Sequence, residues 1–200
     1  MKTIGFASNC YMIVSGGACA VVDPSADESD IIAAADREGL TVKYILLTHV
    51  HFDHILHLGA LRDVTGAPLC VHADDAPALS DPDINLFSMM RQDETFAPAE
   101  VLIRDGELLP LGDENIKVLH TPGHTPGSVT YECGGELLTG DTLFDMSVGR
   151  TDFPGGDETA LYRSIKKLYG MPDGTKIYPG HGESSTIGIQ KHSNPFTKFI

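Results

Sequence analysis

The 200-residue chain lacks long hydrophobic runs, CxxC motifs and low-complexity segments, and it is short of basic residues. Because no run of about 18 apolar residues is present, we predict no transmembrane helix. The opening residues 1–6 lack the apolar core of a signal peptide, so a cytoplasmic location is expected. The four cysteines show no CxxC spacing, which predicts buried, reduced thiols at Cys10, Cys19, Cys70 and Cys133.

The shortage of basic residues makes the chain strongly acidic, with 14 Lys and Arg against 28 Asp and Glu and a net charge of −14. This charge opposes nonspecific binding to nucleic acid and to anionic membranes, so neither is expected as a partner. The same charge would repel an anionic substrate, unless bound cations reverse the sign locally.

No linker, repeat or charge block divides the chain, and its length suits one domain. Apolar periodicity and turn residues predict one α/β domain over residues 1–200, made of two strand-then-helix halves. The predicted strands cover 10–14, 18–22, 42–47, 68–71, 101–103, 107–109, 116–119, 128–132, 136–139 and 176–178. The predicted helices cover 27–39, 54–64, 74–79 and 157–169, with one or two further turns from Gly188. The segment 81–98 has no clear period and is either a loop over a site or an irregular packed connection.

The most distinctive stretch is His49-Val50-His51-Phe52-Asp53-His54, which directly follows the apolar run 44–47. In an extended chain alternate side chains share one face, so His49, His51 and Asp53 should point the same way. If a helix begins at His54, its imidazole turns back towards the same space. Imidazole and carboxylate ligands without cysteine suit zinc, iron or manganese, and they argue against a structural zinc knot.

Three more ligand-type residues lie in Gly/Pro-rich loops where apolar strands end: His124 within 121–128, Asp141 after 137–140, and His181 between Gly180 and Gly182. Proline fixes φ and glycine permits tight turns, so such loops hold a side chain with little freedom. One strand-ending Asp is usually a cap or turn residue. Four strand ends of this kind together predict a metal site.

The seven side chains resemble, in their order, the ligand set of the metallo-β-lactamase superfamily. The spans 121–128, Gly140-Asp141-Thr142-Leu143-Phe144, Gly149-Arg150-Thr151-Asp152 and Pro179-Gly180-His181-Gly182 resemble its small glyoxalase II-like hydrolases. The resemblance covers essentially the whole chain. It implies a four-layer αβ/βα sandwich with the metals at one edge between the two β-sheets.

The resemblance also implies two divalent metal ions, zinc first, with iron and manganese as alternatives. His49, His51 and His124 should hold one ion, and Asp53, His54 and His181 the other. Asp141 and a water should bridge both. Two dications about 3.5–4 Å apart need an anionic bridge, and a shared hydroxide becomes a nucleophile near neutral pH. We therefore expect Asp53 and Asp141 to be the catalytic carboxylates, with no Ser or Cys nucleophile.

Four further residues have open interpretations. The family keeps a carboxylate at the position of Asp23 that fixes the tautomer of a liganding histidine, but a turn-forming Asp before Pro24 is equally reasonable. His57, one turn after His54 on the predicted helix, either supports a ligand or belongs to the core. Arg150 either meets an anionic substrate tail or pairs with Asp152, and Lys191 is a further candidate for substrate binding. His72, His120 and His192 are taken as structural or exposed.

The complete ligand set favours a hydrolase of small acyl thioesters, similar to hydroxyacylglutathione hydrolase, acting as a monomer or homodimer. The chain ends soon after His181, so the helical glutathione-binding domain of full-length glyoxalase II is not expected. One alternative is a persulfide dioxygenase-like enzyme with a single iron. Another is a lactonase or β-lactamase-type hydrolase on the same site. A non-catalytic electron-transfer module is disfavoured, because diiron members of that kind carry Glu at the position of His51.

Overall fold

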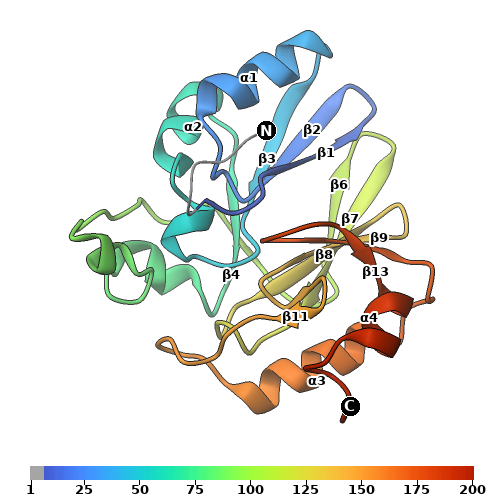
Figure 1. The fold of residues 1–200 in the computed structure, drawn as a ribbon. Coiled ribbons are helices and arrows are strands. Elements are labelled where there is room, and N and C mark those ends of the chain that lie inside the picture. The colour runs from blue at the N-terminus through green and yellow to red at the C-terminus, as the bar shows by residue number, and fades with distance from the viewer. Residues whose placement is uncertain (1–6) are drawn as a thin grey trace.

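The computed structural model describes residues 7–200 and contains two β-sheets that pack face to face (Figure 1). The first sheet has the strand order β1-β2-β3-β4-β5, formed by Tyr11–Ser15, Ala18–Val22, Thr41–Leu46, Leu69–His72 and Val101–Ile103. Strands β1 and β2 form an antiparallel hairpin, and its two-residue turn is Gly16-Gly17 because both positions have positive φ. The other neighbours pair in parallel, and α1 (Glu28–Arg37) and α2 (Leu58–Thr65) make the first two crossovers.

The second sheet has the order β13-β12-β9-β8-β7-β6. In chain order these strands are β6 (Leu108–Leu111), β7 (Glu114–His120), β8 (Val129–Cys133), β9 (Glu136–Gly140), β12 (Lys176–Pro179) and β13 (Ser185–Thr186). Only β9 and β12 pair in parallel, and α3 (Glu158–Leu168) connects them. A small ribbon of β10 (Leu143–Phe144) and β11 (Ser147–Val148) precedes α3, and α4 (Ile187–Ser193) follows β13.

Three apolar layers hold these elements together. One lies between the first sheet and its helices, with Ile31 of α1 and Leu58 of α2 against Ile45 of β3. A central layer joins the two sheets, where Leu46 of β3 meets residues such as Tyr131 of β8. A third lies between the second sheet and α3 and α4. Three apolar layers separate four layers of secondary structure, so the predicted αβ/βα sandwich is confirmed.

The strands and most helices lie where the sequence predicts them, but one helix does not begin at its predicted residue. Residues Phe52–His54 form a single 3-10 turn, η1, and α2 begins only at Leu58. The prediction of a helix from His54 was therefore wrong. The backbone N–H of His57 donates to the carbonyl of Pro24 at 2.9 Å, a tertiary bond that takes this residue out of the helix. The predicted helix 74–79 is also a 3-10 turn, η2 (Ala76–Ser80).

The segment 81–98 is a packed connection that contains the 3-10 turn η3 (Phe87–Met90). Asn85 and Phe87 are buried, and the Asn85 carbonyl accepts a hydrogen bond from the backbone N–H of Phe52 at 2.8 Å. The segment is thereby tied to the turn that carries Asp53 and His54.

Two sequence predictions concern the cysteines and membrane-spanning helices. The four cysteines are free thiols; Cys19 and Cys70 are buried as predicted, whereas Cys10 and Cys133 are only partly buried. No helix within residues 7–200 has the length and apolar character needed to cross a bilayer. The residues 1–6, on which the signal-peptide prediction rests, lie outside the described part of the chain.

Candidate metal centre

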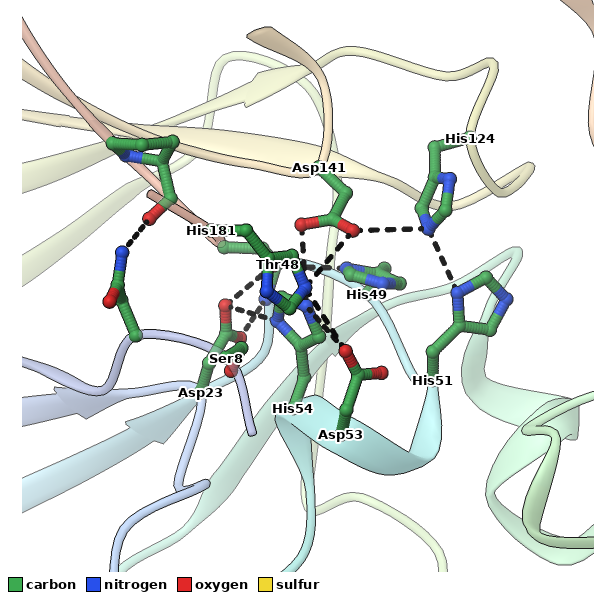
Figure 2. A network of polar contacts seen from close by, with 12 residues as sticks. Ser8, Asp23, Thr48, His49, His51, Asp53, His54, His124, Asp141 and His181 are labelled. Atoms are coloured by element: carbon green, nitrogen blue, oxygen red, sulfur yellow. Dashed lines mark hydrogen bonds and ion pairs between the residues drawn. The ribbon is translucent and has the colours of Figure 1, made fainter. Parts of the chain in front are cut away.

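The seven ligand-type side chains gather where strands of both sheets end (Figure 2). The first sheet contributes the residues that follow β3, and the second sheet contributes three loops that follow β7, β9 and β12. These are His49, His51, Asp53 and His54 from the first sheet and His124, Asp141 and His181 from the second. Strand β3 ends at Leu46, so the expectation of one extended stretch carrying His49, His51 and Asp53 was wrong. The irregular backbone and η1 instead divide the four residues into two pairs.

The cluster contains three sets of candidate metal ligands. Within each set, the ligand atoms lie within 4.8 Å of one another. One set is His49, His51 and His124, the second is Asp53, His54 and His181, and the third joins His49 and His54 to Asp141. The first two sets coincide with the division that the family resemblance implies.

Asp141 lies between the two sets. Its Oδ1 is 3.3 Å from His54 Nε2, and its Oδ2 is 3.6 Å from Nε2 of both His124 and His181. A carboxylate in this position can reach an ion in either set.

The cluster fits a metal because four of its inward atoms have no hydrogen-bond partner. Nε2 of His49, His51 and His54 and Oδ1 of Asp141 are buried without a hydrogen bond. Leaving such atoms unpaired costs about 1–3 kcal/mol each, and native structures rarely tolerate several of them together. Five imidazoles and two carboxylates form a ligand set that suits zinc, iron or manganese.

Outer contacts fix the orientation of two of these imidazoles. His54 Nδ1 donates to Asp23 Oδ2 at 2.9 Å, and Asp23 also accepts from the N–H and the hydroxyl of Thr48 at 2.8 and 2.7 Å. His124 Nδ1 donates to the backbone carbonyl of Arg150 at 2.7 Å. In each ring a proton on Nδ1 leaves the Nε2 lone pair facing the cluster, where that of His124 lies 2.9 Å from His51 Nδ1. Asp23 therefore does more than form a turn, although its φ is +53°.

The local environment favours ionised carboxylates and, at His49, His51 and His124, neutral imidazoles. Burial lowers the pKa of His49 and of His124. The pKa of His51 is lowered to about 3, first by burial and then by the neighbouring imidazole of His124. Burial would raise the pKa of Asp141, but His54 and the other imidazoles around it hold that pKa below its usual range. For His54 the carboxylates of Asp141, Asp23 and Asp53 outweigh burial and raise the pKa. Neutral His and ionised Asp are the forms that bind metal.

A cavity of about 360 Å³ opens over the cluster. Its lining comprises His51, Phe52, Asp53, Leu86, His124, Asp141, Phe144, Val148, Arg150, Phe153 and His181. Leu86 belongs to the segment 81–98, so this packed connection also forms one wall of the site. The sequence offered this segment as a loop over a site or as a packed connection, and the structure shows both features. The sequence did not single out Leu86, because apolar residues in irregular segments carry no period that points to a cavity.

The structure does not bring two of the weaker candidates to the cluster. Within residues 7–200, His57 makes no hydrogen bond to the cluster; its Nδ1 instead lies 2.9 Å from Glu28 Oε2. Lys191 is absent from the cavity lining and pairs with Asp173 at 3.1 Å. Helical spacing suggested His57 but does not specify which neighbour a long or exposed side chain meets. Arg150 does line the cavity, yet its guanidinium pairs with Asp152.

The other three histidines lie outside the cluster. His72 is buried and stacks on His120 with ring centroids 4.0 Å apart, and His192 is exposed near Asp173.

Two residues that support the cluster were missed by the sequence analysis. Thr48 contacts Asp23, and the buried Asp75 binds the loop of His124 through Thr125 and Gly127. The position of Asp75 just after the apolar strand 68–71 was the available signal.

The sequence of this chain is similar to those of known metallo-hydrolases. The family model described as the metallo-β-lactamase superfamily matches residues 3–181. The probable metallo-hydrolase YqgX of Bacillus subtilis is 38% identical to this chain, and the match covers 94% of this chain and 92% of the YqgX sequence. The hydroxyacylglutathione hydrolase GloC of Haemophilus influenzae is 33% identical over 96% of this chain and 93% of its own.

Solved structures agree with the sequence relatives. The B3 metallo-β-lactamase BLEG-1 superposes with a TM-score of 0.92 at 38% identity, covering 98% of this chain and 97% of its own. TTHA1623 in a di-iron-bound form superposes with a TM-score of 0.84 at 33% identity, covering 98% of this chain and 98% of its own. The family match spans the whole cluster from His49 to His181. Sequence, fold and cluster together show that this chain belongs to the metallo-β-lactamase superfamily.

Proposed function

We propose that the protein hydrolyses small acyl thioesters with two bound divalent metal ions, of which zinc is the preferred candidate. The observation that carries the proposal is that three buried imidazole nitrogens without a hydrogen bond, those of His49, His51 and His54, face His124 and Asp141 of the other sheet. Similarity to a hydroxyacylglutathione hydrolase, GloC, supports the thioester as substrate. Similarity to a di-iron-bound structure supports a site for two ions.

The chain's own residues have defined roles in this proposal. His49, His51 and His124 would hold one ion, Asp53, His54 and His181 the other, and Asp141 would bind both. When bound, such ions supply Lewis acidity and lower the pKa of water, so that water can attack a carbonyl near neutral pH. The C–S bond then breaks, the acyl carbon keeps the water oxygen, and the thiolate takes up a proton.

A cysteine nucleophile is not needed for this reaction, and the thiols are unsuited to it. Burial raises the pKa of Cys10 to about 11 and that of Cys70 to about 12. Thiols with such pKa values carry little thiolate near neutral pH. Within residues 7–200, no cysteine lines the cavity over the cluster. The free thiols support a cytosolic location, which stays a prediction, as does a monomeric or homodimeric state.

Metal analysis of the purified protein, combined with a panel of thioesters, a lactone, a β-lactam and a persulfide, tests the proposal. We expect two metal equivalents per chain and hydrolysis of acyl thioesters, with a high KM for S-lactoylglutathione. Oxygen consumption with the persulfide on an iron-loaded sample would indicate the dioxygenase instead. No thioesterase activity in a fully metallated sample would refute the proposal.

The variant Asp141→Asn tests the bridging role directly. An amide oxygen carries no charge, so it is a poor bridge between two dications. We expect metal stoichiometry and activity to fall together. Two retained equivalents with normal turnover would rule out Asp141 as the bridge.

A further inference from the structure

The cavity over the cluster has an apolar wall made of Phe52, Leu86, Phe144, Val148 and Phe153. These five side chains come from η1, the connection before η3, β10, β11 and the loop before α3. The polar part of the lining consists of the cluster residues and Arg150. A substrate whose reacting carbonyl meets the cluster must therefore place its flanking groups against hydrocarbon.

The single arginine in this lining is already paired with a carboxylate. Its Nε and one terminal nitrogen donate to the two carboxylate oxygens of Asp152, each at 2.6 Å. The guanidinium also lies over the Phe153 ring, 4.0 Å from its centroid. A paired arginine offers little net charge to a substrate carboxylate. Within residues 7–200, no other lysine or arginine lines this cavity.

The apolar wall is held in place by its surroundings. Leu86 has φ of +70°, an uncommon conformation for a leucine, yet its side chain is only 4% exposed. Its neighbour Asn85 is fully buried; its amide donates to the Ala78 carbonyl and its side-chain oxygen accepts from the N–H of Phe87. Strained backbone persists only where the surrounding contacts enforce it, and it concentrates at ligand sites. Leu86 is thus a fixed part of the cavity.

We propose that the groups flanking the scissile bond of the substrate are uncharged and apolar, such as a branched or aromatic acyl group on a neutral thiol. This inference rests on the proposed thioesterase function and narrows it. Burial against the apolar wall favours hydrocarbon. A carboxylate on either group would lose hydration without gaining an unpaired lysine or arginine in the lining. The net charge of −14 acts in the same direction, because it repels anions during approach.

A matched pair of substrates tests the charge preference in the wild-type, metal-loaded protein. The S-phenylacetyl thioesters of 3-mercaptopropionamide and 3-mercaptopropionate have the same shape and differ by one negative charge. We expect kcat/KM to be about tenfold higher for the amide, mainly through KM, because the charge affects binding more than the chemical step. Leu86→Ala should lower kcat/KM about tenfold for the phenylacetyl amide and little for its acetyl analogue.

The ion pair of Arg150 offers a variant that should change the preference. Asp152→Asn leaves the guanidinium without its carboxylate, so the preference for the neutral substrate should shrink about threefold, the scale of an exposed ion pair. Asp173→Asn, which frees Lys191 outside the cavity, is the matched control and should leave the ratio unchanged.

The outcomes separate this inference from the proposed function. Equal or better hydrolysis of the carboxylate would overturn the inference while the thioesterase function stands. If neither thioester is hydrolysed, the proposed function fails, and calorimetric binding of the corresponding non-hydrolysable thioethers still tests the charge preference. Tighter binding of the carboxylate thioether would then overturn the inference.

Discussion

Replacing Gly180 by alanine should disrupt metal binding without disrupting the fold. Gly180 immediately precedes His181, and its φ is not positive, so the backbone accepts alanine. A Cβ at this position, however, would overlap Asp141 Oδ1 and lie 2.7 Å from His54 Cε1. Both neighbours belong to the cluster, and His54 is fully buried with its Nδ1 bonded to Asp23. Neither can move without changing the ligand geometry.

The size of the effect follows from these distances. Carbon atoms in contact lie about 3.5 Å apart, so His54 would have to move by roughly 0.8 Å. Metal–ligand distances vary by only about 0.2 Å. We therefore expect Gly180→Ala to lose at least one metal equivalent. Its kcat/KM should fall about 100-fold, the cost of a displacement of about 1 Å in an active site.

Thermal unfolding gives a second measurement that does not depend on substrate. A metal present at 100 times its Kd stabilises the folded state by about 2.7 kcal/mol. At about 2–4 °C per kcal/mol for a protein of this size, added metal should raise the Tm of the wild type by roughly 5–10 °C. Gly180→Ala should show little of this rise, while its metal-free Tm stays close to that of the metal-free wild type.

Two other glycines provide controls. A Cβ on Gly174 meets nothing within 4 Å, and its φ is not positive. Gly182 also has open space, but its φ of +80° makes alanine cost about 1 kcal/mol. Both alanine variants should bind metal as the wild type does. If Gly180→Ala held two equivalents and kept normal activity, close packing against Asp141 would not control the geometry of the site.

Exhaustive chelation should lower the Tm as well as the activity, because ligands from both sheets bind metal only in the folded state; an unchanged melting curve would contradict this. Asp23→Asn should weaken metal affinity about 10- to 100-fold in chelator competition, since the amide accepts the His54 proton less strongly. Burial raises the pKa of Asp75 to about 6, so its ionisation costs the folded state stability as pH rises from about 4 to 6. Asp75→Asn should therefore gain up to about 3 kcal/mol of unfolding free energy relative to the wild type between pH 4 and 7. A pH-independent difference in denaturant titrations would refute that assignment.

The sequence identifies the cluster because each of its residues has a local signal. His124, Asp141 and His181 each follow an apolar strand in a loop rich in glycine or proline, and these loops do converge at one edge of the sheets. Parallel and antiparallel pairing then brings the strand ends together. Local chemistry and strand order are sufficient for this part of the molecule.

Other features depend on contacts that no local pattern encodes. The start of α2 depends on a hydrogen bond from the N–H of His57 to the carbonyl of Pro24, which overrides helical spacing. The sequence could not predict the left-handed backbone conformation of Leu86, because glycine and asparagine are the residues that favour this conformation. His57 and Lys191 instead find partners in Glu28 and Asp173, residues distant in sequence.

The metal centre and the substrate cavity therefore differ in how the sequence specifies them. The cluster needs seven ligands from both halves, and contacts such as the N–H of Val129 donating to the carbonyl of Thr48 at 2.8 Å join those halves beside His49. Substitution of a ligand therefore changes the chemistry directly. The apolar wall instead consists of side chains that are not ligands, so they can be exchanged without replacing one. Substrate preference can thus vary among relatives that share the same cluster, so it must be determined from the shape and charge of the wall of each protein.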